Sequence, residues 1–142
     1  MRRKAREFAV QMLYAVDLNP DPPQECIDTF WELNHARPDV VAYATELVRG
    51  TIRKKKEIDR FISTHSSHWK IDRMPVTDRN ILRLATYELL EEASVPSKVV
   101  INEAIELAKK FGTTDSATFV NGVLDSIHQE LLEAHKTSPS VP

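Results

Sequence analysis

Apolar residues recur at intervals of three and four along almost the whole chain, which is the spacing of one face of an α-helix. Only three glycines interrupt this pattern, and β-branched residues rarely alternate with polar ones. A first helix is predicted over residues 3–18, where the inward positions are Ala5, Ala9, Met12, Leu13 and Val16. Pro20, Pro22 and Pro23 end it, because proline lacks a backbone N–H and constrains the residue before it.

The next segments are predicted to be a short helix and a longer helical stretch. The short helix carries Ile27, Phe30 and Trp31 and ends before Pro38, and Asp39 is predicted to cap the stretch that follows. The expected buried positions of that stretch are Val40, Ala44, Leu47, Val48 and Thr51. The spacing resumes at Ile58, Phe61 and Ile62, so one kinked helix and two separate helices both remain open.

The segment over residues 75–92 is the most apolar of the chain. Its apolar residues cover more than one face: Ile81, Leu82, Leu84, Ala85, Leu89 and Leu90. A helix that is apolar on several sides is surrounded by other helices, so we expect this one at the centre of the fold.

Two more helices are predicted in the C-terminal third. The first covers residues 99–111 and ends at Gly112, which suits a left-handed cap position. Thr114 or Asp115 is expected to cap the last helix. Gly122 lies inside that helix at a cost of about 1 kcal/mol in propensity, which favours tight packing against a neighbour.

The sequence therefore predicts an all-α protein with a single helical domain over residues 1–135 and a disordered tail over residues 136–142. Its 142 residues, of which 42% are hydrophobic and 28% charged, are ordinary for a soluble globular domain. We find no apolar run near the roughly 20 residues that cross a bilayer and no signal peptide. A cytoplasmic location is the default expectation. The lone Cys26 is interpreted as a small buried hydrophobe.

Positive charge is segregated although the formal net charge is only −2. Arg2, Arg3, Lys4 and Arg6 crowd the start of the chain, and a second cluster comprises Arg49, Arg53, Lys54, Lys55, Lys56 and Arg60. A nearly neutral protein with a basic end can still bind phosphate locally.

The first helix is the main candidate for binding chemistry. Arg3, Glu7, Val10 and Tyr14 are predicted to share a solvent-facing stripe, with Arg6 beside it. Guanidinium groups that bind phosphates, followed by a ring that stacks on a base, form a recurrent solution for single-stranded RNA. A merely solvated charged end is the alternative, and the pattern by itself leaves both open. For the second basic cluster, solubility is the preferred interpretation.

No catalytic, cofactor or metal site is expected. His65 and His68 have a spacing compatible with metal binding, but two ligands do not make a zinc site. Cys26 and the histidines form no nucleophile–base signature, and no phosphate-binding glycine loop is present. Glu103 and Glu106 are interpreted as solvent-facing acids.

Four segments of the chain carry a family resemblance. Residues 5–14 (AREFAVQMLY) resemble the opening helix of the NusB transcription-antitermination family, and residues 78–89 (DRNILRLATYEL) resemble its central helix. Residues 95–109 (VPSKVVINEAIELAK), followed by residues 119–125 (FVNGVLD), are similar to its C-terminal signature. Residues 26–60 and the tail match poorly.

The resemblance implies about seven helices in two packed subdomains, and an RNA-binding factor that is not an enzyme. It implies binding to boxA-type single-stranded RNA together with NusE, a ribosomal small-subunit protein. RNA polymerase and other Nus factors would complete a termination-resistant complex on ribosomal RNA operons. A helical module of a methyltransferase and a purely protein-binding scaffold are the alternatives, and a homodimer stays open.

The resemblance also implies roles for individual residues. The RNA-binding positions would be Arg2, Arg3, Lys4, Arg6, Gln11, Tyr14, Asp115 and Phe119. Glu88 matches a position at the NusE contact, and Arg83, one turn earlier, is a looser assignment.

Overall fold

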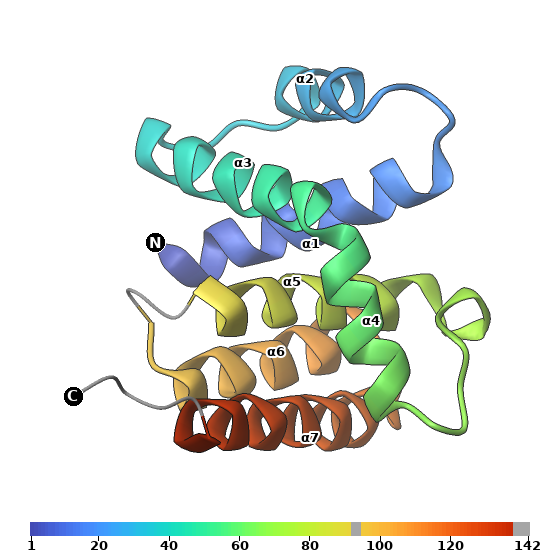
Figure 1. Cartoon of the computed structure of the whole chain (residues 1–142). Helices are drawn as coiled ribbons and strands as arrows, with labels where there is room; N and C mark the ends of the chain where they lie inside the picture. Colours follow the sequence, from blue (N-terminus) through green and yellow to red (C-terminus); the bar gives the residue numbers. More distant parts are fainter. Residues whose placement is uncertain (92–94, 138–142) are drawn as a thin grey trace.

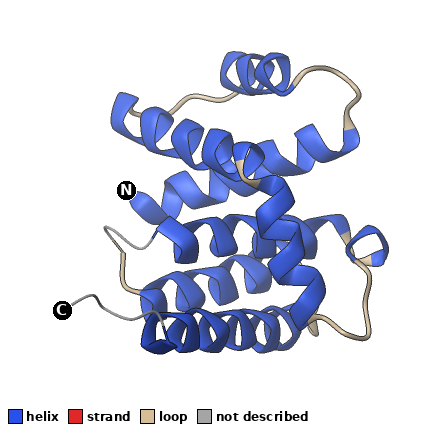
Figure 2. Cartoon of the chain, viewed as in Figure 1, coloured by secondary structure: helices blue, strands red, loops and turns tan. Residues whose placement is uncertain are grey.

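Helices account for most of the chain in the computed structural model, which describes residues 1–91 and 95–137 (Figure 2). The helices are α1 (Arg2–Leu18), α2 (Pro23–Leu33), α3 (Pro38–Arg53), α4 (Lys55–His65), α5 (Val76–Glu91), α6 (Ser97–Phe111) and α7 (Ser116–Thr137). A short 3₁₀ turn, η1 (Ile71–Arg73), precedes α5. These residues include no strand, so the predicted all-α class is confirmed.

Proline sets the start of two helices. Pro23 and Pro38 occupy the first helical positions of α2 and α3, where a missing N–H leaves no hydrogen bond unmade. The prediction that Asp39 caps α3 is wrong, because Pro38 starts the helix one residue earlier. The Asp39 carboxylate instead accepts a hydrogen bond from the N–H of Val40 at 2.9 Å.

The stretch from Pro38 to His65 forms two helices. The backbone departs from helical geometry at Lys54, where ψ is 15°. Its N–H still bonds the carbonyl of Gly50 at 3.1 Å, so α4 starts directly from the last turn of α3. The sequence pattern left this break undecided, since apolar spacing continues across it.

Helix α5 lies at the centre, as predicted. It contacts α1, α3, α4, α6 and α7, and every residue from 80 to 89 is buried. Figure 1 shows α1 crossing between α2 and α3 on one side and the α5–α6–α7 layer on the other, with α4 running across α5 toward α7. The chain thus forms two helical layers that meet at α1 and α5.

Most predicted core positions are buried, and one aromatic cluster was missed. Val16, Phe30, Trp31 and Leu90 are only half-buried, whereas the other predicted inward positions and Cys26 are buried. Phe8, which the predicted stripe left out, packs edge-on against Phe30 and Trp31 with centroid distances of 5.8 and 5.4 Å. These rings attach α2 to α1.

Three expectations for the C-terminal third do not hold. Gly112 has a φ of −99° and is not left-handed. Gly122 has no neighbouring atom within 4 Å of an added Cβ, so it does not mark tight packing. Helix α7 continues through Thr137, which includes the first residues of the predicted tail, while residues 138–142 lie outside the described part.

Gly50 is a glycine that close packing against a neighbouring helix requires, and together with Gly122 it gives a paired test. A Cβ at Gly50 would overlap the ring of Tyr87 on α5. We expect Gly50→Ala to lower the free energy of unfolding by about 1–3 kcal/mol, as overpacking does. Gly122→Ala should raise it by up to about 1 kcal/mol through helix propensity. Urea denaturation measures both values, and equal effects would contradict this account of the α3–α5 contact.

Candidate nucleic-acid interface

The outer face of α1 combines cations with an aromatic ring. Arg3, Gln11 and Tyr14 are exposed and Glu7 is half-buried, whereas Val10 is buried. The exposed stripe therefore passes through Gln11 in place of Val10, one position away from the prediction. Tyr14 is 43% exposed, which leaves its ring accessible for stacking.

Arg3 is accessible and at the same time held in place. Its Nε and Nη2 donate to the two carboxylate oxygens of Glu103 on α6, at 3.1 and 2.7 Å. The Arg3 side chain is nevertheless 65% exposed. The hydrogen bond from Arg3 lowers the pKa of Glu103 against the opposing effect of burial. Glu103 is thus an ion-pair partner, and its interpretation as a solvent-facing acid is wrong.

Arg6 lies inside the protein. Its Nε and Nη2 each donate to the Glu88 carboxylate of α5 at 2.9 Å, and only 3% of Arg6 and 8% of Glu88 is exposed. Burial would lower the pKa of Arg6, but the hydrogen bond and charge of Glu88 raise it above its ordinary value. The prediction that Arg6 sits beside a solvent-facing stripe is therefore wrong. Contacts of Arg6 with RNA and of Glu88 with NusE stay predictions.

Lysines at the end of α6 extend the basic surface beside α1. Lys110 binds Glu7 at 2.9 Å, and Lys4 lies 3.6 Å from the same carboxylate. Lys109 and Lys110 form the last turn of α6, directly before the loop that leads into α7. Sequence reasoning missed Lys110, although two adjacent lysines at a helix end were the available signal.

Asp115 and Phe119 lie where α7 begins. Asp115 is exposed, while Phe119 is half-buried and packs against the core on one side. Both line a pocket of about 230 Å³ between the start of α7, Trp69 and the start of α5. Phe119 is therefore both a packing residue and part of an accessible wall.

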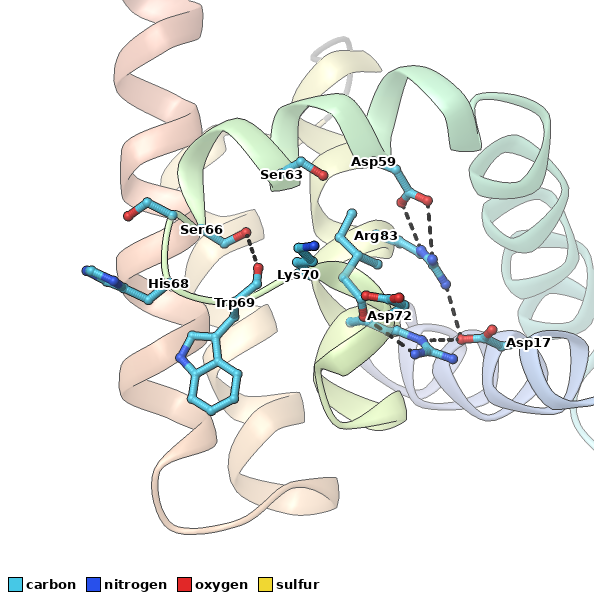
Figure 3. A pocket seen from close by; sticks show the side chains of 12 residues that line it. Asp17, Asp59, Ser63, Ser66, His68, Trp69, Lys70, Asp72 and Arg83 are labelled. Atoms are coloured by element: carbon cyan, nitrogen blue, oxygen red, sulfur yellow. Dashed lines mark hydrogen bonds and ion pairs between the residues drawn. The ribbon is translucent and has the colours of Figure 1, made fainter.

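Arg83 belongs to a different hollow, a cleft of about 740 Å³ between α1, α4 and α5 (Figure 3). It binds Asp59 through Nε at 2.9 Å and Asp17 through Nη1 at 3.1 Å. Arg79 also donates to Asp17, at 2.7 Å. Burial would raise the pKa of Asp17, but hydrogen bonds from Arg79 and Asn80 and the charge of Arg83 lower it. The predicted contact of Arg83 with NusE is not tested by this geometry.

The histidine pair does not converge. His65 contacts Ser126 and Glu130 of α7 at 2.6 and 2.7 Å, which attaches α4 to α7. Within residues 1–91 and 95–137, no group of three or more His, Cys, Asp or Glu side chains is placed to hold a metal ion. In the same residues, no helix is long and apolar enough to span a membrane.

A helical bundle with cations and an accessible ring on one helix defines an all-α protein with a candidate binding face. The sequence model of the NusB family matches residues 3–129, and the chain belongs to this family. Its relatives are transcription antitermination proteins, which is not a family of enzymes.

Individual relatives cover nearly the whole chain. The transcription antitermination protein NusB of Desulfatibacillum aliphaticivorans is 45% identical over 135 residues, which are 95% of this chain and 94% of that protein. A NusB structure from T. maritima superposes with a TM-score of 0.84 at 36% identity, covering 92% of each chain. A crystal structure of the antitermination factors NusB and NusE in complex with double-stranded RNA gives a TM-score of 0.82 at 35% identity, covering 91% of this chain and 96% of that one.

The two ion pairs that arginines of α1 form, Arg3 with Glu103 and Arg6 with Glu88, should differ sharply in their contribution to stability. Arg6→Ala leaves Glu88 as an uncompensated buried charge, so we expect it to lower the free energy of unfolding by about 3–5 kcal/mol. Arg3→Ala removes an exposed pair and should cost less than about 1 kcal/mol. Chemical denaturation of both variants checks this. If both variants lost a similar amount of unfolding free energy, the Arg6–Glu88 ion pair would not be the buried contact that holds α1 on α5.

Asp17 should make stability sensitive to acid. Because the pKa of its carboxyl is lowered in the folded state, its contribution is complete above the ordinary value of 3.8 and is lost as the pH falls through the lower folded value. We therefore expect the stability gap between wild type and Asp17→Asn to be wide at pH 6 and to narrow below about pH 4. Thermal unfolding across this range measures the gap, with Asp125→Asn at an exposed position of α7 as the control. A gap that stays constant down to pH 2 would refute this role of Asp17.

Proposed function

We propose that the chain is an RNA-binding transcription antitermination factor that binds boxA-type single-stranded nascent RNA together with NusE. In this proposal the pair joins RNA polymerase and other Nus factors and makes elongation resistant to termination on ribosomal RNA operons. The names of the relatives support the antitermination role. The related structure with NusE and double-stranded RNA supports the two kinds of partner.

The observation that carries the proposal is the exposed face of α1. Arg2, Arg3 and Lys4 are exposed at its start, and Gln11 and Tyr14 are exposed farther along. Cations of this kind neutralise phosphates, and an accessible ring stacks on a base. The ion pair between Lys110 and Glu7 connects this face to the end of α6.

The proposed RNA-binding set follows this face into the start of α7. It comprises Arg2, Arg3, Lys4, Gln11, Tyr14, Asp115 and Phe119, with Lys110 as an addition. Arg6 has an indirect role, because its guanidinium is committed to Glu88 and lies 3.7 Å from the Glu103 carboxylate that binds Arg3. Arg6 thus helps to fix the group that positions Arg3.

For NusE we propose a separate contact on the side of Arg83. Arg83 forms part of the wall of the 740 Å³ cleft, which also contains the exposed residues Lys70 and Asp72. Arg83 and Glu88 are both buried, at 6% and 8% exposed, so a partner in the cleft would meet exposed lining residues such as Lys70 and Asp72, which Arg83 lies behind. The contribution of Glu88 to NusE binding would then come mainly from holding α1 on α5.

The test compares two double variants in RNA binding. Labelled boxA-like single-stranded RNA is titrated over a range of salt concentrations, with and without NusE. If about four cations contact phosphates, log K falls against log salt with a slope near −3, at roughly 0.7 per contact. Arg3→Ala with Lys4→Ala should weaken binding and make the slope shallower by about 1.4.

The matched control removes the same charge from the second basic cluster. Lys55 and Lys56 are exposed at the start of α4, and their replacement by Ala should leave affinity and slope close to wild type. A flat salt response, or equal losses in the two double variants, would reject the α1 face as the RNA site.

A further inference from the structure

Trp69 is a large ring left in solvent beside the pocket at the start of α7. It is 55% exposed, on the connection between α4 and α5. Figure 3 shows its indole pointing away from the ion-paired Asp59, Arg83 and Asp17. The indole forms a wall of the 230 Å³ pocket that Phe119 lines from α7. Two aromatic side chains from separate elements thus border one small hollow.

One residue of this lining also carries a buried acceptor that has no hydrogen-bond partner among the described residues. Asp78, in the first turn of α5, lines the pocket and is only 5% exposed. Its Oδ1 has no hydrogen-bond partner among the residues that the structure describes. A buried polar atom without a partner costs about 1–3 kcal/mol, so such atoms are rare in folded proteins and call for a ligand or another explanation.

The lining restricts the chemistry of an occupant. The described wall contains two carboxylates, Asp78 and Asp115, and neither lysine nor arginine. The occupant should therefore be flat enough to lie against aromatic rings and should present hydrogen-bond donors to a carboxylate. A volume of about 230 Å³ is below the roughly 300–1,000 Å³ of pockets for drug-sized ligands. It suits one small planar group.

Among RNA bases, guanine meets this requirement best. Its N1–H and N2 amine are adjacent donors that a carboxylate can accept together, whereas the other bases place an acceptor next to a donor on that edge. Sequence-specific RNA recognition commonly stacks splayed-out bases on aromatic rings and reads their edges by hydrogen bonds. The pocket also includes Asp115 and Phe119, which already belong to the proposed RNA face.

We propose that this pocket holds a single guanine base of the bound RNA, stacked against Trp69 and Phe119 and read by the carboxylate of Asp78. The proposal rests on the RNA-binding function argued above. It assigns base specificity to the α5–α7 side of the face, while the start of α1 supplies affinity for phosphates.

The experiment measures base preference separately from affinity. Two labelled 12-nucleotide RNAs are used, an all-uridine strand and the same strand with one central guanine, together with a third in which inosine replaces the guanine. Wild type should bind the guanine strand at least about fivefold more tightly than the uridine strand, as expected for a bidentate base contact. Inosine lacks the N2 amine and should lose most of this gain.

Variants then assign the preference to the pocket. Asp78→Asn should bring the guanine-to-uridine ratio close to one without changing binding of the uridine strand. Asp72→Asn is the matched control, because it removes the same charge from an exposed position facing the neighbouring cleft and should keep the ratio. Should Asp78→Asn fail to fold, Trp69→Ala, which removes an exposed ring, should reduce the ratio in a folded protein.

The possible outcomes distinguish a failure of the pocket proposal from a failure of the proposed RNA-binding function. A guanine preference that survives in Asp78→Asn and Trp69→Ala, or that is absent in wild type, overturns the pocket proposal. Loss of NusE binding in Asp78→Asn with an unchanged RNA ratio also overturns it, and assigns the pocket to a cationic side chain of that partner. The RNA function itself fails only if binding of the uridine strand does not depend on Arg3 and Lys4.

Discussion

The buried ion pair between Arg6 and Glu88 is the contact on which the arrangement of α1 depends. It joins the helix that carries the exposed cations to the helix at the centre of the bundle, with both hydrogen bonds at 2.9 Å. Neither charge has much access to water, so each is stable in the fold only while the other is present. The ion pair therefore fixes the position of α1 relative to α5, and with it the position of one helical layer on the other.

That position determines how the surface charges are presented. The Glu103 carboxylate binds Arg3 on its solvent side and lies 3.7 Å from the Arg6 guanidinium on its buried side. Glu7 is shared between Lys4 and Lys110 in the same way. Exposed cations held by half-buried carboxylates lose less side-chain freedom when they bind a phosphate. A protein with a net charge of −2 can thus maintain a basic, ordered face at one end.

Sequence periodicity predicted the helices, the central place of α5 and most of the core, because apolar spacing records burial directly. It failed where a partner distant in sequence decides the outcome. Arg6 can be buried because its guanidinium binds Glu88. That partner lies 82 positions farther along the sequence, so no local pattern around Arg6 reveals it. The predicted exposed stripe of α1 included Val10, whereas the actual stripe includes Gln11. Adjacent positions around a helix cannot be told apart by spacing until the places of α3 and α5 are known. Trp69 and Asp78 lie outside any periodic apolar stripe, so only the folded chain brings them to one pocket.

The two hollows that meet at Trp69 differ in how their polar groups are satisfied. In the cleft on one side, the carboxylates of Asp17 and Asp59 are bound by Arg79 and Arg83, so these four charges are already paired within the chain. In the pocket on the other side, a carboxylate oxygen of Asp78 is buried without a partner among the described residues, next to accessible rings. A ligand gains little from replacing ion pairs that the protein has made for itself, but it gains a full hydrogen bond where an acceptor is unmet. Specific recognition is therefore expected from the smaller pocket, and the larger cleft is better suited to contact over a broad surface.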